Sequence, residues 1–167
     1  MSAGRRSTED DIVTEVVPTA HPDAQWCLEQ YFAHLDREFP DGFDPSAGGG
    51  DDDEQNFTER GVFLLLRDRA LDADARPVGC GAVTSLSAEL SEVKRMWIAP
   101  SHRGRGLGGR LLAELEAHAR QLGHTEACLD TNENLPNAIA MYRHYGYADV
   151  ARYNDNPYAT HFFRKRL

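Results

Sequence analysis

Arginines and glycines alternate in the stretch "RGRGLGGR", residues 103–110, and this spacing favours the binding of an anion. Three guanidinium groups can donate charge-assisted hydrogen bonds to a phosphate; they belong to Arg103, Arg105 and Arg110. Three glycines let the backbone come close to such a group, because no Cβ stands in the way; they are Gly104, Gly106 and Gly108. A helical pattern begins at Leu107, so unpaired N–H groups and the helix dipole add to the attraction. The stretch therefore predicts a phosphate or pyrophosphate site at the start of a helix.

Two classes of ligand compete for this site. Residues 104–109, "GRGLGG", match the G-x-G-x-x-G of a dinucleotide-binding fold, and Asp130 follows at the distance of its ribose-binding acid. In that fold the first glycine comes almost directly after a strand, whereas "PSHR" intervenes here. Too few residues follow Asp130 to build further βα units. A dinucleotide-binding oxidoreductase is therefore the weaker alternative, and an acyl-CoA site is the stronger one.

The elements that position this stretch follow from hydrophobic periodicity. Period-two or apolar runs predict strands, and residues spaced by three and four predict helices. The expected strands are residues 12–18, 61–68, 77–86, 91–99, 125–131, 147–153 and 159–167, and the expected helices are 21–39, 107–122 and 135–146. Short connections make residues 61–99 an antiparallel meander. The helix that follows makes strands 91–99 and 125–131 parallel neighbours.

The predicted fold is therefore an α/β fold: a mixed, mostly antiparallel sheet with a central parallel strand pair flanked by helices. Residues 1–10 are expected to be a flexible tail, and residues 11–167 a single domain. Residues 40–57 form a long acidic loop, which is either a functional lid or a tolerated surface insertion.

Composition narrows the function. The chain has 167 residues and a net charge of −9, which argues against nucleic-acid or anionic-membrane binding. No run is apolar and long enough for a signal peptide or a membrane span, so a cytoplasmic protein is expected. Histidines and cysteines do not cluster, so no metal is predicted, and the three separated cysteines are expected to be reduced.

Two motifs resemble the GCN5-related N-acetyltransferases, the GNAT family. Its phosphate loop, Gln/Arg-x-x-Gly-x-Gly/Ala, corresponds to Arg103, Gly106 and Gly108, preceded by the strand "VKRMWIAP". Its second motif is similar to "NAIAMYRHYGY", with Asn137, Tyr142 and Gly146 in matching positions. Tyr147 stands where the family usually has phenylalanine. The resemblance runs from about residue 77 to the C-terminus.

The resemblance implies a GNAT-type sheet and transfer of the acetyl group of acetyl-CoA to a primary amine, by direct attack in a ternary complex. It places the cofactor's phosphates on residues 103–108 and its pantetheine arm between the strand ending at Ile98 and the strand 126–131. A backbone N–H near Met96 would face the thioester carbonyl. Asn137 either hydrogen-bonds the arm or caps its own helix.

Two side chains are candidates for the chemistry by the same resemblance. Tyr142 is the candidate general acid for the leaving thiolate, and its alternative role is that of a packed aromatic. Glu92 is the candidate general base, or else a solvated charge at a strand start. From Glu92, alternation along the strand predicts that Lys94 and Met96 share its face. Glu89, His144 and His161 are weaker candidates.

The acceptor is expected to be a small-molecule amine or a peptide. Family resemblance places the acceptor pocket in the first helix, the loop after it and the C-terminal strands; the aromatic residues there are Trp26, Tyr31, Phe43, Tyr153 and those of "NDNPY". Homodimers are common in the family and compatible with this sequence. A non-catalytic acyl-CoA-binding or sensor module remains the main alternative, since it would need the phosphate loop but neither Glu92 nor Tyr142.

Overall fold

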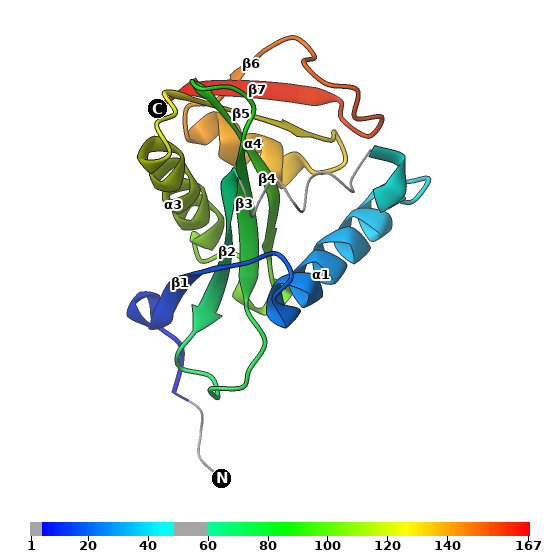
Figure 1. Cartoon of the computed structure of the whole chain (residues 1–167). Helices are drawn as coiled ribbons and strands as arrows, with labels where there is room; N and C mark the ends of the chain where they lie inside the picture. The colour runs from blue at the N-terminus through cyan, green and yellow to red at the C-terminus, as the bar shows by residue number, and fades with distance from the viewer. Residues whose placement is uncertain (1–4, 49–59) are drawn as a thin grey trace.

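The computed structural model describes residues 5–48 and 60–167, which form one mixed sheet with helices on both faces (Figure 1). The strands are β1 (Ile12–Val17), β2 (Gly61–Asp68), β3 (Gly79–Ser85), β4 (Leu90–Ile98), β5 (Glu126–Thr131), β6 (Ala148–Asp149) and β7 (His161–Arg166). The α-helices are α1 (Pro22–Glu38), α3 (Leu107–Gln121) and α4 (Pro136–His144). Short 3₁₀ turns are η1 (Glu9–Asp11), η2 (Pro45–Gly48) and η3 (Pro100–His102).

The strands lie side by side in the order β1-β2-β3-β4-β5-β7-β6. The neighbours β2, β3 and β4 are antiparallel, as their short connections predict, and β1 is antiparallel to β2. On the other side of the sheet, β7 is antiparallel to both β5 and β6. Among the strands of the described residues, β4 and β5 alone form a parallel pair, and α3 connects them. The predicted mostly antiparallel sheet with a central parallel pair is confirmed.

The parallel pair is joined over a short distance. Its pairing runs from Leu90 with Glu126 to Glu92 with Cys128 and goes no further. Beyond Glu92 the two strands diverge, so their facing edges turn toward a cavity rather than toward each other. This splayed pair is the framework of the site described below.

The core has one layer on each face of the sheet. On one face α3 and α4 pack on the strands through Leu111, Leu115, Ile139 and their neighbours. On the other face α1 packs through Cys27 and Leu28 against Phe63, Leu65 and Trp97. The helix α1 begins at Pro22, where the His21 ring accepts a hydrogen bond from the backbone N–H of Asp23 at 3.0 Å.

A bulge interrupts β4 opposite Gly81. Ala82 pairs with Lys94 and Cys80 with Trp97, so Arg95 and Met96 together face one residue of β3. Arg95 has a φ of 60°, and the Cys80 thiol donates to its carbonyl at 3.2 Å. The extra residue reverses the alternation: Met96 packs against the α3 side of the core, whereas Trp97 packs against α1. The prediction that Met96 continues the face of Glu92 and Lys94 is wrong for this reason.

The structure shortens one expected strand and describes only part of the acidic loop. The expected strand 147–153 is reduced to the two residues of β6, because the chain then leaves the sheet. The Arg152 guanidinium holds that departure by donating to the carbonyls of Asn154, Asn156 and Ala159. Of the acidic loop 40–57, residues 49–57 lie outside the described residues. Over the residues that are described, no helix has the length and apolar character to cross a membrane.

Candidate active site

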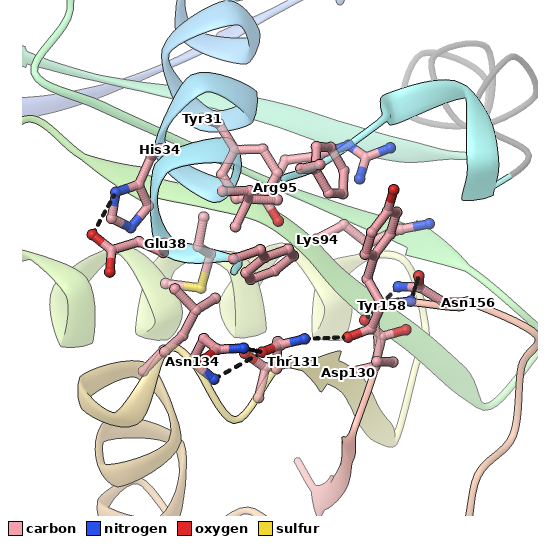
Figure 2. Close-up of a pocket in the computed structure, with 18 of the residues that line it drawn as sticks. Tyr31, His34, Glu38, Lys94, Arg95, Asp130, Thr131, Asn134, Asn156 and Tyr158 are labelled. Atoms are coloured by element: carbon pink, nitrogen blue, oxygen red, sulfur yellow. Dashed lines mark hydrogen bonds and ion pairs between the residues drawn. The ribbon is translucent and has the colours of Figure 1, made fainter. Parts of the chain in front are cut away.

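A cavity of about 780 Å³ runs along the splayed edges of β4 and β5 and is covered by α1, α4 and the segment 153–159. Arg103 and His34 line one end, which adjoins the stretch 103–110 and is called here the phosphate end. Met96 and Tyr142 line the middle. Phe43, Tyr153 and Tyr158 line the opposite end, called here the acceptor end. Figure 2 shows His34 and Glu38 on one side of the cavity, and Tyr158 and Asn156 on the other.

The backbone of the phosphate loop, residues 103–109, is shaped to receive a ligand. Gly104 and Gly106 have φ angles of 75° and 74°, a left-handed conformation that favours glycine. A Cβ added at either position would meet nothing within 4 Å. Among the described residues, none accepts a hydrogen bond from the backbone N–H groups of residues 104–109. These donors and the N-terminus of α3 form an open, polar cradle, an arrangement that favours the binding of an anion.

The three arginines of the stretch take different directions. Arg103 lines the cavity, and its Nε donates to the carbonyl of Ile98 at 2.9 Å. Arg105 instead donates to the hydroxyl of Ser7 at 3.1 Å and to the Ser7 carbonyl. Arg110 donates to backbone carbonyls of the N-terminal segment at 3.0 and 2.7 Å. Only the Arg103 side chain therefore reaches the cavity.

The later glycines of the stretch serve helix packing. A Cβ at Gly108 would lie 2.9 Å from the Met141 sulfur, and one at Gly109 would lie 2.1 Å from the Tyr145 hydroxyl. Both contacts are with α4 or the residue that ends it. Close approach of α3 and α4 therefore accounts for these two positions, whereas positive φ angles account for Gly104 and Gly106.

A buried hydrogen-bonded chain supports the turn before the phosphate loop. The His102 ring contacts the Asp68 carboxylate through Nε2 at 2.8 Å and the Ser101 hydroxyl through Nδ1 at 2.8 Å. Burial opposes ionisation of Asp68, but hydrogen bonds from Ser7 and His102 outweigh it and lower the pKa of this carboxyl. The end of β2 and the turn η3 are thereby held together.

Tyr142 and Met96 meet in the middle of the cavity. The Tyr142 hydroxyl lies 3.7 Å from the Met96 sulfur, and 8% of the residue is exposed. Burial raises the pKa of this phenol, and the nearby Tyr31 and Asp130 add to the increase. The phenol therefore remains a proton donor at neutral and alkaline pH.

Glu92 lies toward the acceptor end, in contact with Tyr153 and Lys94. Its Oε2 accepts a hydrogen bond of 2.7 Å from the Tyr153 hydroxyl, and its Oε1 lies 3.5 Å from Lys94 Nζ. Only 5% of Glu92 is exposed. The pKa of Tyr153 is raised, first by burial and second by the negative charge of Glu92. This phenol therefore stays protonated and donates its hydrogen bond to Glu92. Glu92 is thus a fixed carboxylate inside the cavity, not a solvated strand-start charge.

A second carboxylate, Asp130, lies at the end of β5. Its oxygens accept hydrogen bonds from the side-chain amides of Asn154 at 2.6 Å and Asn156 at 3.2 Å. Within the described part of the chain it makes no ion pair. Tyr31 lies near both Asp130 and Arg95. The pKa of its phenol is raised, chiefly by burial; the charge of Arg95 opposes this increase and that of Asp130 adds to it. Figure 2 shows Arg95 and Asp130 on opposite sides of the cavity.

An aromatic wall closes the acceptor end. Phe32 and Phe43 are stacked with ring centroids 5.6 Å apart and planes 19° from parallel. Tyr158 lies 4.7 Å from Phe43, and Phe39 touches both. The wall is fixed by hydrogen bonds from the backbone N–H of Phe43 to Asp36 and from that of Asp44 to the Tyr158 hydroxyl.

The structure gathers part of the predicted site around one cavity. Five predicted residues line it: Glu92, Met96, Arg103, Asn137 and Tyr142. Gly104, Arg105, Gly106 and Gly108 lie in the adjoining loop and helix start, and Ile98 contributes its carbonyl to Arg103. Of the expected pocket aromatics, Trp26 is the exception, because it packs on Trp97 at 5.9 Å.

Sequence reasoning missed three charged groups of the acceptor end: Lys94, Arg95 and Asp130. Lys94 and Arg95 were overlooked because the sequence assigned their strand to the cofactor. The bulge that turns Arg95 toward the cavity has no recognisable pattern in the sequence. Among the residues with described positions, no group of three or more His, Cys, Asp or Glu side chains is arranged to hold a metal ion.

Comparison with known proteins gives a consistent result. The sequence profile of the Acetyltransferase (GNAT) family matches residues 26–147. An IAA acetyltransferase of Azospirillum brasilense is 41% identical over 126 residues, which cover 75% of this chain and 79% of that protein.

Solved structures agree on the fold. An acyl-CoA N-acyltransferase from Klebsiella pneumoniae is 26% identical, with a TM-score of 0.70 over 93% of this chain and 97% of its own. A phosphinothricin acetyltransferase from Sinorhizobium meliloti, solved in complex with acetyl-CoA, has a TM-score of 0.66 at 17% identity, over 94% of this chain and 89% of its own.

Proposed function

The chain belongs to the acetyltransferase (GNAT) family, and from this premise we propose that it transfers the acetyl group of acetyl-CoA to a primary amine. The observation that carries the proposal is the cavity itself. It is lined by a buried phenol, that of Tyr142, and a buried carboxylate, that of Glu92, and through Arg103 it adjoins the open backbone cradle of residues 104–109. A sensor module would need the cradle alone.

The phosphate loop is proposed to hold the diphosphate of acetyl-CoA. The N–H groups of residues 104–109 and the dipole of α3 supply the attraction, and the open space at Gly104 and Gly106 admits the phosphates. Arg103 adds a cation at the entrance to the cavity. The pantetheine arm would then lie between the diverging edges of β4 and β5, where backbone groups face the cavity.

The middle of the cavity suits the transfer itself. The amine nitrogen forms a bond to the thioester carbonyl carbon, and the carbon–sulfur bond breaks. A backbone N–H near Met96 is proposed to stabilise the charge that develops on the carbonyl oxygen, and the bulge of β4 at this point supports the proposal because it interrupts the regular strand pairing. Tyr142 protonates the departing thiolate, because its raised pKa keeps the hydroxyl protonated, and solvent restores that proton.

Glu92 is proposed as the general base. An amine attacks only when it is neutral, so the ammonium form must first lose a proton. The Tyr153 hydroxyl fixes the orientation of the Glu92 carboxylate, and Lys94 balances part of its charge. The proton passes to Glu92 directly or through one water molecule.

The test is the release of free CoA from acetyl-CoA across a panel of primary amines. We expect at least one amine to release CoA, and Glu92→Gln to lower kcat by about 10²-fold or more, the usual contribution of a general base. Glu89→Gln is the matched control, since Glu89 is exposed and lies outside the cavity. Thermal stabilisation by CoA but not by NAD excludes the dinucleotide alternative. No CoA release with any amine would refute the proposal.

A further inference from the structure

The acceptor end contains an unusual combination of groups for an amine pocket. A cavity that selected only for positive charge would be lined by carboxylates. Here Lys94 and Arg95 line the same end as Glu92 and Asp130. The pocket thus offers both signs of charge next to the aromatic wall of Phe32, Phe43 and Tyr158.

The two charges nearest the reaction centre are closely spaced. Glu92 Oε1 and Lys94 Nζ lie 3.5 Å apart. An α-amino acid carries its ammonium and carboxylate groups on the same carbon atom, at a similar separation. It can therefore place its ammonium against Glu92 and its carboxylate against Lys94, matching each charge with its opposite.

Arg95 adds a second cation on the carboxylate side. The β4 bulge and its φ of 60° turn the residue toward the cavity, and the guanidinium lies 5.2 Å from the centre of the Phe32 ring. A planar guanidinium held against a ring keeps a fixed orientation and suits a carboxylate. The same ring belongs to the aromatic wall, so the anion and ring subsites are adjacent.

The aromatic wall suits a flat apolar side chain. Its rings come from α1, the segment after it and the segment 153–159, and the hydrogen bonds at Phe43 and Tyr158 fix them. A ring placed on this wall would gain offset-stacked or edge contacts. A polyamine has no group for the wall and would bring further positive charge against Lys94 and Arg95.

We propose that the acceptor is an aromatic α-amino acid, with its amine at Glu92, its carboxylate at Lys94 and Arg95, and its ring against Phe43. This inference rests on the proposed acetyl transfer, and the bonds that form and break are those given above. The products are the N-acetyl amino acid and CoA.

The first experiment compares phenylalanine with two molecules that each lack one group. Phenethylamine has no carboxylate, and glycine has no ring. With acetyl-CoA fixed, CoA release and the mass of the acetylated product are followed. We expect kcat/KM for phenylalanine to exceed that for each analogue by about tenfold or more, the usual effect of one charge-assisted contact or one buried ring.

The second experiment assigns the carboxylate subsite. Arg95→Gln is expected to lower kcat/KM for phenylalanine at least tenfold more than for phenethylamine, because only phenylalanine has a carboxylate to lose. Arg95→Lys, which keeps the charge, is expected to retain more of the preference. Thermal unfolding first confirms that each variant is folded. A folded Arg95→Gln that loses activity equally with both substrates would overturn the assignment.

The outcomes separate the two levels of inference. If spermidine releases CoA faster than phenylalanine, or if phenethylamine equals phenylalanine, the amino-acid acceptor is wrong and acetyl transfer stands. If no amine releases CoA and acetyl-CoA does not raise the melting temperature, both fail. Preference for phenylalanine that disappears in Arg95→Gln supports the inference.

Discussion

Removing the hydroxyl of Tyr142 is the most direct test of the chemistry. In Tyr142→Phe the ring stays and only the proton donor is lost. If the phenol protonates the leaving thiolate, kcat should fall by about 10²- to 10⁴-fold, the range for general acid catalysis. Among the described residues, the hydroxyl makes one hydrogen bond, a weak one to the Met96 sulfur at 3.7 Å. The free energy of unfolding should therefore change by no more than about 1 kcal/mol, or about 2–4 °C in melting temperature.

The assay has three readouts on the same preparation. Free thiol release gives kcat, calorimetric titration gives the dissociation constant of acetyl-CoA, and thermal unfolding gives stability. The dissociation constant should stay within about threefold, since that corresponds to well under 1.4 kcal/mol. Tyr145→Phe is the matched control, because Tyr145 ends the same helix but lies outside the cavity.

The pH profile adds a check that packing alone cannot imitate. Burial raises the pKa of Tyr142, so the folded protein keeps this phenol protonated beyond the ordinary value of about 10. Ionisation of Tyr142 should therefore cause no fall in wild-type kcat at any pH below about 10. A kcat within about threefold of wild type for Tyr142→Phe, with an unchanged pH profile, would show that the phenol is only a packed aromatic.

Three further predictions concern the loop, the core and pH. Gly106→Ala should cost about 1–2 kcal/mol of stability, because φ at this position is 74°, and it should also weaken acetyl-CoA binding. Denaturation measures the first effect and calorimetric titration the second. If neither changes, the proposed phosphate-binding role of this loop is wrong. Lys165→Met leaves the Glu116 carboxylate buried without its cation and should destabilise the fold by about 3 kcal/mol or more in urea unfolding. The control Asp149→Asn, at an exposed ion pair, should leave the urea midpoint nearly unchanged. The pKa of Asp68 is lower in the folded protein than in the unfolded chain, so the unfolded chain binds a proton at this carboxyl more readily. The stability that Asp68 contributes is therefore present above about pH 4 and is lost as the pH falls through the lower folded pKa. In unfolding experiments at different pH, Asp68→Asn should weaken the loss of stability in acid.

Local signals allowed much of the fold to be predicted. The strand over residues 61–68 is confirmed residue by residue as β2, and α1 lies within the expected range 21–39. Both are marked by continuous patterns and clear end residues. The parallel pair followed from the order strand, helix, strand. Expectations failed where tertiary contacts decide the backbone. Strand β6 ends after two residues, and Arg152 holds the departing chain by its carbonyls, although Tyr147, Val150 and Tyr153 favour a strand over residues 147–153.

The site was predictable to the extent that it lies on motifs. Arg103 and Tyr142 belong to two regular segments, and the cavity brings both to its lining. The contact of Tyr153 with Glu92 joins residues 61 positions apart through an irregular segment, so no spacing rule could indicate it. Arg95 required knowledge of the bulge, which depends on how β4 pairs with β3.

The brief pairing of β4 with β5 has a mechanical consequence. Three residue pairs, from Leu90 to Glu92, join the two halves of the sheet, and the ion pair between Glu116 and Lys165 ties α3 to β7 near that same end. Beyond Glu92, side-chain contacts connect the halves across the cavity: Tyr142 with Met96 and Tyr153 with Glu92. A motion that widens the gap along Met96 can therefore break these side-chain contacts and leave the three backbone pairs intact.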